Sequence, residues 1–131
     1  MILRLRPGAD NKKTQAVVEQ WYREQIRQAA PPLIAKWEPV MGVKVARLFV
    51  RHMRTRWGSC NSRTRSIRLN TELAKKPPQL LECVVVHEMA HLIVRHHDDR
   101  FTSILDKHLP QWRLHRQELN SAALRHETWR Y

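Results

Sequence analysis

The sequence predicts an α+β fold in which a short β-sheet follows an N-terminal helical segment and precedes a strongly apolar, buried helix and further C-terminal helices. Two observations support this class. Apolar residues recur at helical spacing near the N-terminus and in the second half of the chain, whereas two short segments between them alternate apolar with charged residues. Because 131 residues suffice for one hydrophobic core but hardly for two, a single domain over residues 1–131 is expected.

The first expected element is an amphipathic helix over Asn11–Trp37. Its apolar side chains follow three- and four-residue spacings, as Val17 and Trp21 illustrate, which is typical of a helix packed on a core. Pro31 and Pro32 should interrupt or kink it, because proline lacks a backbone donor and clashes with the preceding turn.

Two short strands are expected next, at Val43–Val50 and Ser66–Asn70, where β-branched residues or leucines alternate with charged ones. The segment Trp57–Ser62 between them carries residues typical of turns. Within it, the Trp57 side chain should pack in the core, and Gly58 should permit an unusual backbone angle.

Three helices are expected after the sheet. Pro77 and Pro78 suit the first turn of a helix, and the following Leu80–Val94 is apolar on nearly all sides, which indicates a buried helix. Arg100–His108 and Gln111–Arg125 should form the last two, separated by a leucine–proline pair.

Basic residues give the chain a net charge of +12 and are concentrated in the strand region. Between residues 39 and 71 no acidic residue occurs, and the basic ones are Lys44, Arg47, Arg51, Arg54, Arg56, Arg63, Arg65 and Arg68. Such a surface attracts nucleic acid or an acidic polypeptide. The alternative is a solvated basic face without a specific partner.

Cysteine content and hydropathy bear on location. Cys60 and Cys83 are too few to suggest a disulfide framework, which fits a reduced compartment. The basic segment Met1–Gly8 lacks the apolar run of a signal peptide, and no stretch approaches the ~20 apolar residues of a membrane span. We therefore expect a cytoplasmic protein without a membrane partner.

The apolar helix contains a motif with the spacing of a metal site, His87-Glu88-Met89-Ala90-His91. Residues four apart lie one turn above each other, so His87 and His91 can bind the same zinc ion. Glu88 then lies beside the metal, where a general base takes a proton from zinc-bound water. Histidines satisfied by core hydrogen bonds are the alternative, but burying three such polar groups in so apolar a helix is costly without a compensating cation.

A catalytic zinc site usually has three protein ligands, so a third is expected beyond the helix. His97 stands six residues after the second histidine, and His96, Asp98 and Asp99 are its competitors. Spacing alone does not choose among them. The metzincin pattern shares the six-residue spacing but requires a glycine where this chain has Val94, so that class is rejected.

Several stretches together carry a resemblance to a known family: Arg54–Cys60, Ile67–Asn70, Val85–His91, and His97 followed by Phe101 and Trp112. They resemble the YgjP-like metallopeptidases, neighbours of the SprT-like zincins, over roughly Val43–Leu119. The resemblance implies a zincin-like fold, Zn²⁺ as cofactor, His87, His91 and His97 as its ligands, and Glu88 as the catalytic base. The chain departs from the family in having Met89 where leucine is common, and in lacking a longer β-rich N-terminal region.

The function expected from this resemblance is hydrolysis of peptide bonds in a polypeptide substrate. Similar zincins hold the substrate as an extra strand on a sheet edge, and Ser66–Asn70 is either that edge or an inner strand. The candidate substrate contacts are Ile67, Arg68, Leu69 and Asn70. Oxyanion stabilisation needs a nearby donor, and Arg95, His96 and His108 all remain candidates.

A second hypothesis is a nucleic-acid-associated binding module with a purely structural metal. Its contacts would be Arg47, Arg51, Arg54, Arg56, Arg63 and Arg65. Structural zinc sites are usually closed by four ligands rich in cysteine, which favours the enzyme. Both ideas combine in a protease recruited to DNA-bound proteins, by analogy with SprT-like relatives.

Overall fold

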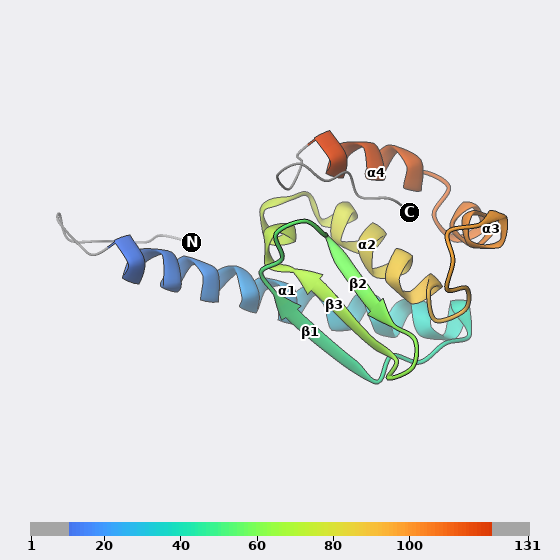
Figure 1. The fold of residues 1–131 in the computed structure, drawn as a ribbon, viewed down its shortest axis with the longest axis horizontal. Coiled ribbons are helices and arrows are strands. Elements are labelled where there is room, and N and C mark those ends of the chain that lie inside the picture. Colours follow the sequence, from blue (N-terminus) through green and yellow to red (C-terminus); the bar gives the residue numbers. More distant parts are fainter. Residues whose placement is uncertain (1–10, 122–131) are drawn as a thin grey trace.

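Four α-helices and three strands follow one another along residues 11–121, the part of the chain that the structure, a computed structural model, describes (Figure 1). In chain order they are α1 (Asn11–Met41), β1 (Arg47–Arg51), β2 (Gly58–Asn61), β3 (Ser66–Asn70), the 3₁₀ helix η1 (Thr71–Lys75), α2 (Pro78–Ala90), α3 (Asp99–His108) and α4 (Trp112–Ser121). The predicted α+β class is confirmed.

The three strands form one sheet in the order β1-β3-β2, with β1 parallel and β2 antiparallel to β3. In β3 the Ile67 and Leu69 side chains are both 0% exposed, whereas Arg68 between them is exposed. Figure 1 shows α1 and α2 behind the sheet, and both helices contact its strands. The apolar face of the sheet therefore lies against these two helices.

The sheet decides between two alternatives that the sequence left open and corrects one expectation. Ser66–Asn70 is the central strand, not an edge, because β1 pairs with one side of it and β2 with the other. Part of the segment predicted to be a turn, Gly58–Asn61, is the strand β2. The edges of the described sheet are thus β1 and β2.

Helix α1 continues through Pro31, Pro32 and Pro39 without the predicted interruption. All three prolines are exposed, while the opposite side of the helix buries an apolar stripe that contributes to the core: Ile26, Ala30, Ile34, Trp37 and Met41. Burial of this stripe offsets the backbone hydrogen bonds that the prolines remove. Although α1 is 31 residues long, neither it nor any other helix in residues 11–121 combines the length and apolar character needed to cross a bilayer.

Helix α2 is the buried helix that the sequence predicted, but it is shorter. It begins at Pro78, where the missing N–H costs little, and every residue from Cys83 to Ala90 is buried. It ends at Ala90 instead of continuing to Val94, because the N–H groups of His91, Leu92 and Ile93 bond to carbonyls three residues back.

The connection between α1 and α2 is polar. Glu82 Oε2 accepts hydrogen bonds from Lys36 Nζ at 2.7 Å and from Trp37 Nε1 at 2.9 Å. Partial burial acts to raise the pKa of Glu82, but these two bonds outweigh it and hold the pKa below its ordinary value. Glu82 is therefore a charged link between α1 and α2.

The last two helices lie close to their predicted positions. The Asp98 side chain accepts a hydrogen bond from Phe101 N at 3.2 Å and so caps α3, which ends at His108 as expected. Helix α4 covers the start of the predicted Gln111–Arg125 segment, of which residues 122–125 lie outside the described part. Trp112 is buried, and its Nε1 donates to Asp106 Oδ1 at 2.7 Å, which joins α4 to α3.

Candidate metal centre

The structure brings together the three histidines that the sequence singled out. His87 lies in α2, His91 is its C-terminal cap, and His97 lies in the segment that leads to α3. One ring nitrogen from each lies within 4.8 Å of the other two. His87 is 3% exposed, His91 is half-buried and His97 is exposed, so the group opens towards solvent on one side.

Hydrogen bonding orients the His91 ring. Its Nδ1 lies 3.1 Å from the carbonyl oxygen of Val94, and because that oxygen only accepts, Nδ1 carries the hydrogen. The Nε2 atom of the neutral ring then has a free lone pair. This bond forms because the helix ends at Ala90 and the chain then turns. The position at which α2 ends therefore fixes the tautomer of His91.

All three imidazoles are held in their neutral form. Burial is the largest influence that lowers the pKa of His87, His91 and His97, and the positive charge that each would place beside the others lowers it further for the first two. The two Nε2 atoms of His91 and His97 lie only 2.8 Å apart. Two neutral rings share at most one hydrogen across this gap, whereas a cation could accept a lone pair from both.

Phe101 of α3 packs against all three rings. Its ring is stacked on His91 with centroids 4.5 Å apart, and its centroid lies 4.9 Å from His87 and 5.0 Å from His97. Phe101 is fully buried, so it forms an apolar wall that limits the rotation of the imidazoles. The sequence marked Phe101 only as part of a family resemblance and gave no indication of this role.

Glu88 is buried beside the histidines and is 2% exposed. Burial raises the pKa of its carboxyl to about 8, although the charge of Arg56 acts in the opposite direction. A nearby dication would also favour the charged carboxylate. Glu88 is thus a carboxyl group that the fold keeps away from bulk water, and burial favours its protonated form.

The β2 strand closes the site on the Glu88 side. A Cβ atom placed on Gly58 would lie 2.8 Å from Val84 Cγ1 and 3.1 Å from both Arg68 O and Glu88 Cγ. Gly58 does not have a positive φ, so the predicted reason for this glycine is wrong. A glycine is needed because β2 approaches α2 so closely, not because of a special backbone angle.

Cys60, two residues further along β2, does not join the histidines. Burial, and secondly the charge of Glu88, raise the pKa of its thiol to about 12, so it stays protonated. Burial likewise raises the pKa of Cys83 in α2 to about 12. Neither cysteine belongs to the convergent group of possible ligands. Cys83 is part of the hydrophobic core.

The donor set fits a zinc ion. Neutral imidazoles are preferred zinc ligands, and zinc at about 2.0–2.1 Å from each nitrogen would separate them by roughly 3.3 Å, which small ring rotations from the observed arrangement can reach. Three nitrogens and no thiolate leave one tetrahedral position open, as in catalytic sites. The competing ligands fit less well, since Asp98 caps α3, and His96 and Asp99 are outside the convergent group.

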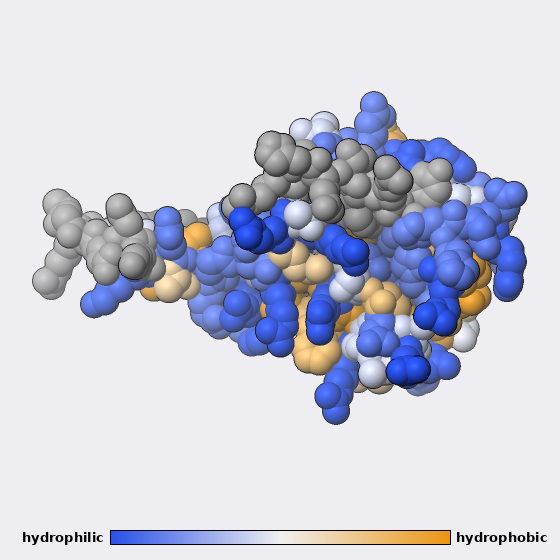
Figure 2. Space-filling model, viewed as in Figure 1, coloured by the Kyte–Doolittle hydropathy of each residue, from blue (hydrophilic) through white to orange (hydrophobic). Residues whose placement is uncertain are grey.

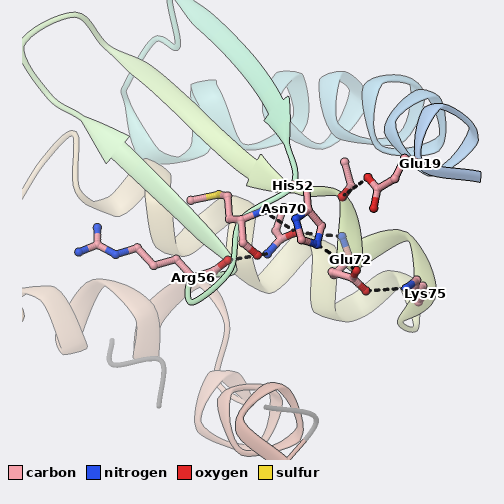
Figure 3. A network of polar contacts seen from close by, with 8 residues as sticks. Glu19, His52, Arg56, Asn70, Glu72 and Lys75 are labelled. Atoms are coloured by element: carbon pink, nitrogen blue, oxygen red, sulfur yellow. Dashed lines mark hydrogen bonds and ion pairs between the residues drawn. The ribbon is translucent and has the colours of Figure 1, made fainter. Parts of the chain in front are cut away.

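A second group of possible ligands, Glu19, His52 and Glu72, also occurs among the described residues (Figure 3). Its carboxylates already have partners. Glu72 forms an ion pair with Lys75 at 2.8 Å, and its hydrogen bond raises the pKa of that lysine. A cation here would compete with an ammonium group, so the histidine group is the better candidate metal centre.

Asn70 fixes the loop that leads into β2 (Figure 3). It is 0% exposed, and its Nδ2 donates to the carbonyl oxygens of Met53 at 2.8 Å and Arg56 at 2.7 Å. Its Oδ1 accepts from Glu72 N at 3.0 Å, and its own N–H donates to Trp57 O at 3.0 Å. Asn70 therefore positions the backbone just before Gly58. It lies on the inner strand of the described sheet and not on a substrate edge, which decides between the two alternatives that the sequence left open.

The six arginines predicted to contact an acidic partner are all exposed, but they occupy three separate places. They lie on β1, in the loop before β2, and in the turn between β2 and β3: Arg47, Arg51, Arg54, Arg56, Arg63 and Arg65. Only Arg56 has a charge that influences Glu88. The strand region is thus basic on several faces.

The predicted oxyanion donors are not equivalent. Arg95 and His96 are exposed in the segment after α2, whereas His108 packs the edge of its ring on Trp37 with centroids 5.8 Å apart. Arg116 of α4 was not predicted from the sequence. Its charge lowers the pKa of His87, after the larger effects of burial and of the other two imidazoles. Its position, far along the chain from the motif, gave no sequence signal.

Comparisons with known proteins identify the family of this chain. A family model described as "YgjP-like, metallopeptidase domain" matches residues 2–122. The chain therefore belongs to the YgjP-like metallopeptidase family, and the match extends over the N-terminal helix, beyond the region in which the sequence motifs lie. A search of curated proteins found no match.

Two solved structures share the fold. The metallopeptidase zymogen abylysin of Pyrococcus abyssi has a TM-score of 0.64 at 14% identity, covering 70% of this chain and 91% of its own. The metallopeptidase zymogen jannalysin of Methanocaldococcus jannaschii has a TM-score of 0.55 at 16% identity, covering 63% and 88%. At such low identity the likeness establishes the zincin-like fold alone.

The close approach of β2 to α2 predicts the effect of enlarging Gly58. Gly58→Ala should lower the free energy of unfolding by about 1–3 kcal/mol, because the added methyl overlaps Val84. The double variant Gly58→Ala/Val84→Ala removes the nearest obstruction. Its loss in the free energy of unfolding should therefore be smaller than the sum of the losses of the two single variants. Urea denaturation of the four proteins measures this coupling, and strictly additive losses would contradict the proposed contact.

The hydrogen bonds of Asn70 predict a large effect of removing its side chain. Asn70→Ala should cost about 3 kcal/mol, since buried carbonyl and amide groups lose their partners. Asn61 is a matched control, because its Oδ1 accepts from Arg63 N and Thr64 N at the surface, and Asn61→Ala should cost less than about 1 kcal/mol. Equal losses in chemical denaturation would show that Asn70 does not fix the loop.

Proposed function

We propose that this protein is a zinc-dependent peptidase in which His87, His91 and His97 bind the metal and Glu88 is the general base. The observation that carries the proposal is the convergence of three neutral imidazoles beside a buried carboxylate. Membership of a metallopeptidase family supports the reaction class, which is hydrolysis of a peptide bond. The substrate is accordingly a polypeptide.

Zinc supplies two things to such a site when it is bound: it lowers the pKa of a ligated water towards about 7, and it polarises a substrate carbonyl. The remaining chemistry belongs to the side chains of this protein. Glu88 accepts a proton from the attacking water and later donates it to the departing amine. Its burial beside Gly58 keeps bulk water from competing for that proton.

The fold also indicates how a substrate is held. Strand β2 is an edge of the described sheet, and a Cβ atom placed on Gly58 at its start would lie 3.1 Å from Glu88 Cγ. An extended peptide that pairs with the free edge of β2 would therefore pass close to the proposed base. This assignment replaces Ile67, Arg68, Leu69 and Asn70, which lie on the central strand, as the surface for substrate pairing.

Positive charge near the site favours the transition state. Arg56 acts electrostatically on Glu88, and Arg116 acts on His87. We propose that these two guanidinium groups stabilise the negative charge that develops on the scissile carbonyl oxygen. Both are better placed for this than His108, which packs against α1.

Replacing the base tests the proposal. Glu88→Gln should retain zinc, because the histidines are unchanged, and lose about 10²–10⁴-fold in the rate of hydrolysis of fluorogenic peptides. Glu82→Gln on the same helix is the matched control, since Glu82 bonds to Lys36 and Trp37 and not to the site. Undiminished activity of Glu88→Gln with zinc bound would refute the assignment of the base.

A further inference from the structure

A groove lies between α1 and the free edge of β1, at the opposite edge of the sheet from the proposed peptidase site. Its cavity has a volume of about 170 Å³ and is lined by Arg23 and Arg27 of α1 and by residues 48–51 of β1, which include Arg51. Three of the lining side chains are guanidinium groups and none is acidic. The groove therefore has the electrostatic character of an anion-binding site.

Arg23 supplies a hydrogen-bond donor that the described residues leave without an acceptor. Its Nε atom is buried and has no hydrogen-bond partner among them. Buried polar atoms without a partner are rare, because each costs roughly 1–3 kcal/mol. Arg27 differs, since it is half-exposed and pairs with Glu24 at 3.0 Å. A negatively charged group in the groove would satisfy Arg23.

The β1 edge supplies a second kind of donor and acceptor. β1 pairs only with β3 in the described sheet, and its register places Leu48 opposite Ile67 and Val50 opposite Leu69. Arg47 N bonds to Arg65 O on the β3 side. In a parallel ladder alternate residues point the same way, so the backbone N–H and C=O groups of Leu48 and Val50 face the groove.

The outer face of the sheet beside this edge is also basic. The half-buried ring of Phe49 lies 5.8 Å from the Arg51 guanidinium and 5.9 Å from that of Arg68. Figure 2 shows hydrophilic side chains interleaved with hydrophobic surface over this part of the molecule. A strand added to β1 would thus have guanidinium groups on both of its faces, Arg23 and Arg27 on one and Arg51 on the other.

We propose that this groove is a docking site for an extended, acidic polypeptide segment, which adds a strand to β1. Carboxylates at alternate positions would meet Arg23 and Arg27, and the peptide backbone would pair with Leu48 and Val50. Nucleic acid fits less well, because phosphates could satisfy the arginines but nothing in a nucleic acid continues the backbone ladder. Two strand spacings, about 10 Å, separate this edge from β2, so the site is independent of the proposed peptidase site.

The test uses a fluorescently labelled peptide of alternating Glu and Val, titrated with the full chain. Arg23→Gln/Arg27→Gln should weaken binding about tenfold or more, because two charge-assisted contacts are lost. Arg63→Gln/Lys107→Gln removes the same charge from exposed positions outside the groove and should change affinity less than about threefold. If the double variant does not fold, Arg27→Gln alone, at an exposed position, should still weaken binding measurably.

Two further measurements separate strand addition from charge attraction. The same peptide with all of its backbone amides N-methylated should lose binding, and the intact peptide should slow hydrogen exchange of the Leu48 and Val50 amides. Equal weakening by both charge pairs, unchanged binding of the N-methylated peptide, or unchanged exchange at Leu48 and Val50 would overturn the proposal. So would a single-stranded oligonucleotide that binds the groove more tightly than the peptide.

Discussion

The structure depends on the convergence of three uncharged imidazoles beside one buried carboxyl group at the end of an apolar helix. Ionised or unpartnered, these groups would destabilise α2, because its other residues from Cys83 to Ala90 are apolar and buried. The surrounding elements stabilise this arrangement. Phe101 packs against the three rings, the Val94 carbonyl orients His91, and Gly58 allows β2 to pack closely over Glu88. A cation that accepts the lone pairs of the ring nitrogens would stabilise the group as a whole.

The sequence predicted the helices well, since helical periodicity is a local property. It failed where tertiary packing decides. β2 consists of residues typical of turns, and it is a strand only because it pairs with β3 and packs closely against α2. The order of the strands in the sheet was not predictable either, because β1 pairs with β3 and not with β2, the next strand along the chain. The interruption of α1 at Pro31 and Pro32 was predicted wrongly, since an exposed proline costs a helix little when the opposite face is buried.

The candidate site was predictable to the extent that its residues lie close together in the chain. The spacing of His87 and His91 follows from helix geometry, and the family resemblance chose His97 among four neighbours. Asn70 and Arg116 act from distant segments, and neither has a sequence pattern that indicates its role. Asn70 was named only as a candidate substrate contact, whereas its side chain is buried and holds the loop before β2.

The most direct test of the metal centre compares two adjacent histidines. Zinc content and affinity, measured by competition with a chromophoric chelator, should show an equimolar ion in the unaltered protein and in His96→Ala. Removing a residue that only orients a metal ligand lowers the metal affinity by roughly 10–100-fold. His97→Ala should lower the zinc affinity by more than this, because it removes a ligand. Zinc binding that is weakened by His96→Ala and not by His97→Ala, or by neither, would contradict the central claim.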